Sequence, residues 1–173
     1  LEAAPGLPLL GLLPERAHPP DAHGPPLAVT TDRALDLLGS DPEGFVLVAE
    51  CEVTDTTAHD QDAAALVDAV AELDAALQAV LERVDLATTL VVVTADHDTS
   101  GTAIVRGRMD DRRAWVRFVA DNHTGQWVPL FAFGAGAEAL AGVRDNTELG
   151  ALLGRLLGLG GFPHAERPEA PRG

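Results

Sequence analysis

The sequence predicts an α/β fold in which a mostly parallel sheet is flanked by helices. Residues 44–50 and 88–94 are short apolar runs rich in valine, the pattern of buried strands. Between them, residues 62–84 repeat apolar side chains every three or four positions, which is typical of an amphipathic helix. A strand, a helix and a second strand form a βαβ unit, and such units build parallel sheets.

Three features are expected before or at the start of the long helix. Residues 30–38 predict a short helix that ends at Gly39, because glycine commonly terminates helices. Residues 51–61 are polar and rich in threonine and acidic side chains, which predicts a loop. Asp62 follows that loop and is expected to cap the long helix.

Four features are expected after the second strand. Residues 95–101 are polar and predict a loop, and residues 102–120 predict a weaker pair of strands around a charged excursion. Residues 128–133 predict a third strand, in which Pro129 indicates a strand start or an edge position. A final helix is expected at 146–157, capped by its first or second residue.

Composition limits the classes of partner. The net charge is −15, and all 12 basic residues are arginine. Such an acidic surface argues against nucleic acid and anionic membranes. No apolar run reaches the length of a membrane span, and residues 1–13 lack the basic start of a signal peptide. The single cysteine, Cys51, excludes an internal disulfide and a cysteine zinc cluster.

Titratable side chains gather in a first polar segment after the strand at 44–50. Glu50 ends that strand, and Asp55 and His59 follow it, four residues apart. Carboxylate oxygen and imidazole nitrogen are typical zinc ligands, and this spacing lets both reach one ion if the segment turns helically. Taken alone, the segment reads equally well as a solvated acidic loop.

Two further loops carry the remaining candidate ligands. Asp96 and His97 directly follow a strongly apolar strand, and unpaired buried charge is costly, so these groups require a partner. A backbone carbonyl could satisfy His97, and a lone histidine such as His123 is more often structural than a ligand. Taken together, the three loops supply three histidines and three carboxylates, which suit zinc and a harder cation such as magnesium.

The three motifs together resemble the alkaline phosphatase family. Residues 50–59 reproduce the family's Glu, Asp and His spacing, residues 94–97 its Thr-Ala-Asp-His strand exit, and residues 123–125 its late His-Thr-Gly. The resemblance covers residues 8–159 and implies the family's α/β fold, here as an incomplete domain. It also implies metal-dependent hydrolysis of phosphate monoesters.

The resemblance implies two zinc ions and one magnesium ion as cofactors. The implied ligands are Asp55, His59 and His123 for the first zinc, Asp96 and His97 for the second zinc, and Glu50 for the magnesium. Related two-metal phosphodiesterases, phosphomutases and sulfatases remain alternatives for the reaction. A catalytically degenerate metal-binding domain is a further alternative.

The nucleophile is the main departure from the family pattern. The family uses a serine that follows an aspartate, whereas Ser40 and Ser100 are the two serines here and neither follows an aspartate. The chain is therefore expected to supply metal ligands without the nucleophile and to be nearly inert alone. Cys51 and Glu52 also stand where the family has small residues.

The sequence divides into three segments, and the resemblance implies where the protein is located. The segments are a proline-rich lead-in at residues 1–28, the metal-binding α/β phosphatase portion at residues 29–160, and a flexible tail at residues 161–173. The resemblance implies a periplasmic or extracellular location, a phosphate ester substrate, and allows a homodimer.

Overall fold

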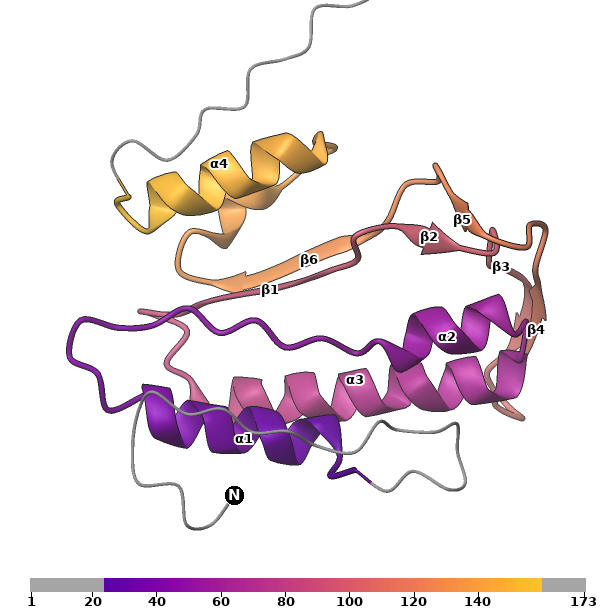
Figure 1. The fold of residues 1–173 in the computed structure, drawn as a ribbon, viewed down its shortest axis with the longest axis horizontal. Helices are drawn as coiled ribbons and strands as arrows, with labels where there is room; N and C mark the ends of the chain where they lie inside the picture. Colours follow the sequence, from indigo (N-terminus) through magenta and orange to yellow (C-terminus); the bar gives the residue numbers. More distant parts are fainter. Residues whose placement is uncertain (1–23, 160–173) are drawn as a thin grey trace, which may run out of the picture. The chain divides into compact units, whose positions relative to one another are not determined.

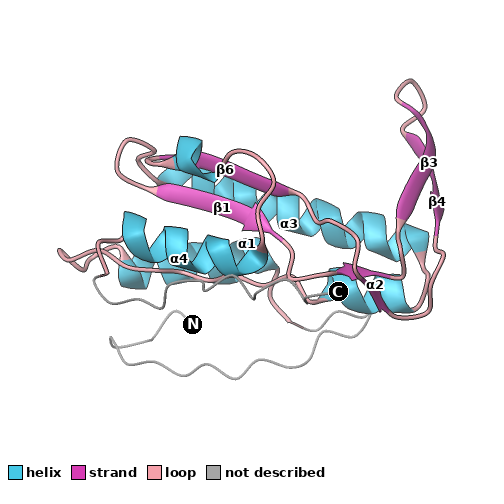
Figure 2. Ribbon diagram, turned by 90° about the horizontal axis from the view of Figure 1, so that it is seen from above, coloured by secondary structure: helices cyan, strands magenta, loops and turns pink. Residues whose placement is uncertain are grey.

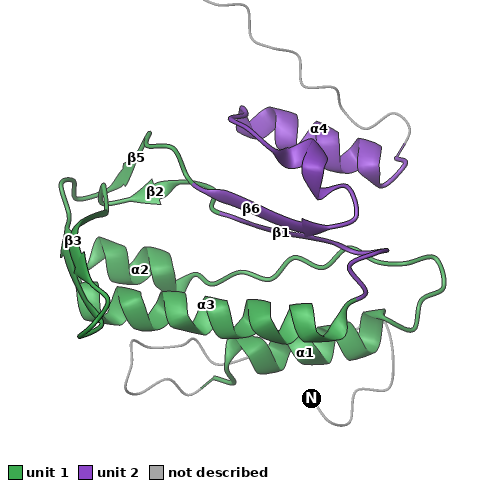
Figure 3. Ribbon diagram, turned by 180° about the vertical axis from the view of Figure 1, so that it is seen from behind, with its two compact units in different colours: residues 1–84, 95–128 green, residues 85–94, 129–173 purple. Residues whose placement is uncertain are grey.

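The computed structural model describes residues 24–159. Its described residues form two compact units: residues 24–84 with 95–128, and residues 85–94 with 129–159 (Figure 3). Most of the predicted lead-in and all of the predicted tail lie outside the described residues.

Three helices form the main body of the first unit: α1 (Leu27–Leu38), α2 (Val53–His59) and α3 (Ala63–Arg83) (Figure 1). Both shorter helices pack on α3. Three buried alanines, which are Ala65, Ala69 and Ala76, line the packed side of α3. Alanine has little side-chain bulk, so neighbouring helices can approach closely.

Ion pairs join the middle and C-terminal part of α1 to the C-terminal end of α3. The guanidinium of Arg83 donates to Asp32 and to Asp36, at 2.5 and 2.6 Å. The hydrogen bond from Arg83 lowers the pKa of Asp36 below its ordinary value. The contact fixes α1 along the last turns of the long helix.

Two small antiparallel sheets complete the first unit. Strand β2 (Asp98–Thr99) pairs with β5 (His123–Thr124), so that Thr99 lies opposite His123. Among the described strands, β3 (Ala103–Arg108) and β4 (Arg113–Arg117) pair only with each other (Figure 2). Arg106 stacks on the Trp115 ring within this hairpin, 4.9 Å from the ring centroid.

The second unit contains one antiparallel strand pair and two helical segments. Strand β1 (Leu90–Thr94) pairs with β6 (Leu130–Gly134). The 3-10 helix η1 (Ala137–Leu140) and helix α4 (Asn146–Leu156) follow. Asp145 and Glu148 form a reciprocal capping box that starts α4, one residue before the predicted cap. No described helix is both long and apolar enough to cross a membrane.

The α/β class is confirmed, but the strand pairing differs from the predicted one. All three sheets of the described residues are two-stranded and antiparallel. The strand predicted at 44–50 is irregular chain, in which Val46 and Val48 are 66% and 86% exposed. An apolar run becomes a strand only where a neighbouring backbone hydrogen-bonds with it, and none of these sheets includes this segment.

The loop predicted at 51–61 was also wrong, because it contains α2. Its threonines favour turns over helices, yet Thr57 donates its hydroxyl to Val53 O within the helix at 2.7 Å. Thr57 and Ala58 are buried in this helix, which packs on α3. Burial of this face outweighs the weak helix propensity of the sequence.

Replacing Asp62 with alanine is expected to lower the free energy of unfolding by about 1 kcal/mol. Asp62 Oδ1 accepts hydrogen bonds from Ala64 N and Ala65 N at the start of α3, as the sequence predicted. Urea denaturation of the whole chain measures the change. Asp74→Ala, at an exposed position within α3, is the control, and it should stay within about 0.5 kcal/mol of wild type. Equal losses in both variants would contradict the capping role.

Candidate metal centre

Helix α2 presents a carboxylate and an imidazole on one face. Asp55 and His59 are one helical turn apart, so their side chains lie one above the other. Asp55 Oδ2 is 3.5 Å from His59 Nε2. Their side chains are 35% and 33% exposed, which leaves the pair accessible from solvent. The helical turn on which the zinc interpretation depended is therefore present.

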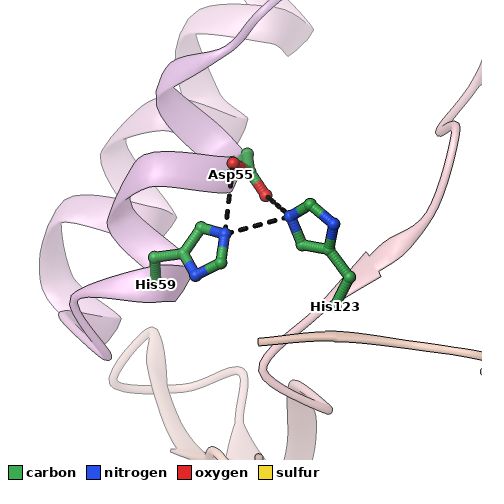
Figure 4. A group of neighbouring side chains, drawn as sticks. All are labelled: Asp55, His59 and His123. Atoms are coloured by element: carbon green, nitrogen blue, oxygen red, sulfur yellow. Dashed lines mark hydrogen bonds and ion pairs between the residues drawn. The ribbon is translucent and has the colours of Figure 1, made fainter. Parts of the chain in front are cut away.

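Strand β5 brings a second imidazole to the same place (Figure 4). His123 Nε2 is 3.4 Å from Asp55 Oδ1 and 3.0 Å from His59 Nε2. The three residues each offer a ligand atom within 4.8 Å of the others. Within residues 24–159, they are the one group of three or more potential metal ligands that lies together.

The spacing of these atoms fits a zinc ion. Zinc binds nitrogen and oxygen at about 2.0–2.2 Å in tetrahedral geometry, so adjacent ligand atoms lie roughly 3.3 Å apart. The three closest approaches, 3.0, 3.4 and 3.5 Å, bracket that value. Asp55 turns a different oxygen toward each histidine, and both histidines point their Nε2 atoms inward. Two imidazole nitrogens and one carboxylate form a donor set typical of zinc.

A second carboxylate–imidazole pair adjoins this cluster. Asp96 Oδ2 lies 3.3 Å from His97 Nε2, again close to the separation of two ligands on one ion. The His97 ring stacks on the His123 ring, with centroids 3.6 Å apart and planes 21° apart. The five residues predicted as zinc ligands are thus gathered in one region of the first unit. They remain proposed ligands.

Glu50, the predicted magnesium ligand, is not joined to this group. It is exposed on the irregular segment before α2. Within residues 24–159, no hydrogen bond or ion pair connects it to the other five predicted ligands. The structure therefore offers no cluster for magnesium around Glu50.

Two polar residues that the ligand assignment omitted hold the site in place. Thr99 Oγ1 donates to Asp55 Oδ1 at 2.5 Å and lies 3.3 Å from His97 Nδ1. Asp98 Oδ2 accepts hydrogen bonds from Thr124 Oγ1 and Gly101 N, which fastens β2 to β5. Alternation along an extended chain could have indicated Thr99, since residues two apart share one side of a strand.

Ser100 ties the two ligand-bearing loops together through its backbone. Its amide donates to Asn122 O, and its carbonyl accepts from Val119 N and Ala120 N. The residue adopts a φ of +60° and is fully buried. A left-handed backbone at a residue other than glycine carries strain, which these hydrogen bonds offset. The buried hydroxyl is not available to a substrate.

These features define an α/β protein with a candidate zinc centre whose proposed ligands lie on α2, on β5 and directly before β2. The sequence model of the alkaline phosphatase family matches residues 5–110 of this chain. The chain therefore belongs to the alkaline phosphatase family, as its motifs predicted.

Curated relatives and solved structures agree with this assignment. The chain is 30% identical to alkaline phosphatase of Escherichia fergusonii over 152 residues, covering 78% of this chain and 32% of the relative. It is 29% identical to streptomycin-6-phosphate phosphatase of Streptomyces griseus, covering 91% and 46%. Alkaline phosphatase of the Antarctic bacterium TAB5 superposes with a TM-score of 0.68 at 25% identity, covering 76% and 41%. The chain thus spans less than half the length of each.

Replacing Asp55 with alanine is expected to weaken zinc binding by at least about 100-fold, because loss of an outer partner alone costs about 10–100-fold. Competition with a chromophoric zinc chelator measures the affinity of the whole chain. Asp68→Ala, at an exposed position on α3, is the matched control and should bind zinc as wild type does. Unchanged affinity in the Asp55 variant would remove this residue from the ligand set.

Proposed function

We propose that this chain carries the zinc-binding part of an enzyme that hydrolyses phosphate monoesters. The convergence of Asp55, His59 and His123 is the observation that carries the proposal. Family membership supports the reaction class. One relative is named for the phosphate monoester streptomycin 6-phosphate, which supports monoesters as the substrate class.

In this proposal, the chain's own residues bind and orient two zinc ions. Asp55, His59 and His123 hold the first, and Asp96 with His97 holds the second. Bound zinc would supply a Lewis acid that stabilises charge on the transferring phosphoryl group. Part of the cluster remains open to solvent, with His123 45% exposed, so a phosphate ester can reach the ions.

Neither serine of this chain suits the role of nucleophile. Ser100 is fully buried, and Ser40 lies at the end of α1, where its hydroxyl donates to Leu37 O. The proposal therefore assigns metal binding, and not covalent attack, to these 173 residues. Family likeness also leads us to propose an extracytoplasmic location and a homodimer.

A degenerate metal-binding domain is the second candidate, and Glu50 favours it. The family resemblance implies that this residue holds magnesium, yet it is exposed and, within residues 24–159, makes no hydrogen bond or ion pair with the proposed zinc ligands. A protein that retains zinc but lacks the magnesium site would fit that reading. Magnesium content separates the two candidates.

The whole chain is expected to bind zinc while hydrolysing p-nitrophenyl phosphate at a rate close to background. Metal analysis of the purified chain and an activity assay of the same sample measure both properties. Asp55→Ala serves as the control for zinc held by the proposed ligands.

Each other outcome has a distinct meaning. Turnover that a chelator abolishes would show that the chain supplies its own nucleophile, against the assignment above. Absence of zinc would defeat the ligand assignment. Zinc without magnesium would favour the degenerate domain over the enzyme.

A further inference from the structure

One hydroxyl contacts ligands of both proposed zinc subsites. Thr99 Oγ1 is 2.5 Å from Asp55 Oδ1, in the first subsite, and 3.3 Å from His97 Nδ1, in the second. The residue is 8% exposed, so water competes little for these contacts. Its position in β2 is fixed by pairing with His123, a third ligand.

The chemistry of the hydroxyl determines the direction of both hydrogen bonds. Threonine has one hydroxyl proton, and an ionised carboxylate can only accept, so Thr99 donates to Asp55. The hydroxyl can then only accept at its other contact, which requires a proton on His97 Nδ1. In the neutral imidazole the lone pair is then on Nε2, the atom that lies 3.3 Å from Asp96 Oδ2.

We propose that Thr99 is a positioning residue that orients Asp55 and selects the His97 tautomer whose Nε2 can bind metal. The proposal rests on the zinc centre proposed above and adds a residue to it. Outer partners of this kind fix the ring orientation and tautomer of metal-binding histidines. The His97 ring stacks on His123, a ligand of the first subsite, so the orientation of His97 also affects the packing around that subsite.

Thr99→Val removes the hydroxyl and keeps the shape of the side chain, whereas Thr99→Ser keeps the hydroxyl. The valine variant is expected to bind zinc about 10–100-fold more weakly, and the serine variant to restore most of that loss. Chelator competition on the whole chain measures both. Thr31→Val is the matched control, because this buried threonine of α1 has a hydroxyl without a hydrogen-bond partner among residues 24–159.

The tautomer of His97 is a readout specific to the proposed role of Thr99, because a general loss of structure would not move the proton from one ring nitrogen to the other. Asp96→Ala removes the competing acceptor near Nε2, and ¹⁵N shifts of the His97 ring are then recorded in zinc-free protein. The proton is expected on Nδ1 when Thr99 is present. Adding Thr99→Val should move it toward Nε2.

These measurements separate the two proposals. A wild-type chain that binds no zinc would overturn the metal centre, while the tautomer still decides whether Thr99 controls His97. A wild-type chain that binds zinc, together with an equally tight valine variant, would overturn the role of Thr99 alone. A serine variant as weak as the valine variant would also overturn it, since the hydroxyl would then not matter.

Discussion

The antiparallel pairing of β2 with β5 is the interaction on which the candidate site depends. Helix α2 already supplies a carboxylate and an imidazole one turn apart. The third group of that cluster comes from His123, which lies 64 residues beyond His59 in the chain. The two strands are only two residues long, so side-chain bonds from Asp98 and backbone bonds at Ser100 stabilise a pairing that the ladder alone would hold weakly.

The negative charge of the chain favours the binding of cations at this site. The chain carries 27 acidic residues against 12 basic ones, and the carboxylates of Asp55, Asp96 and Asp98 at the site are among them. Cations are attracted to such a surface, and a bound ion would relieve the mutual repulsion of the groups that hold it. Because ligand groups must be assembled before an ion is held tightly, metal binding and folding of the first unit should be thermodynamically coupled.

The sequence predicted the local features better than the long-range ones. The long helix and its Asp62 cap follow from periodicity and capping chemistry, both of which act over a few residues. The family was identified from three short motifs whose internal spacing is local as well. Helix α2 was missed, because it depends on burial against α3, and the irregular segment 44–50 was predicted as a strand without knowledge of a pairing partner.

The hairpin of β3 and β4 has a consequence for how this unit tolerates change. It separates β2 from β5 in the sequence, yet within the described part of the chain its strands pair only with each other. Lengthening a segment whose ends are already held together costs little loop-closure entropy. Insertions or deletions at the hairpin tip would therefore leave the register of Thr99 with His123 unaltered. The β3–β4 hairpin can therefore change in length during evolution while the pairing of β2 with β5 stays constant.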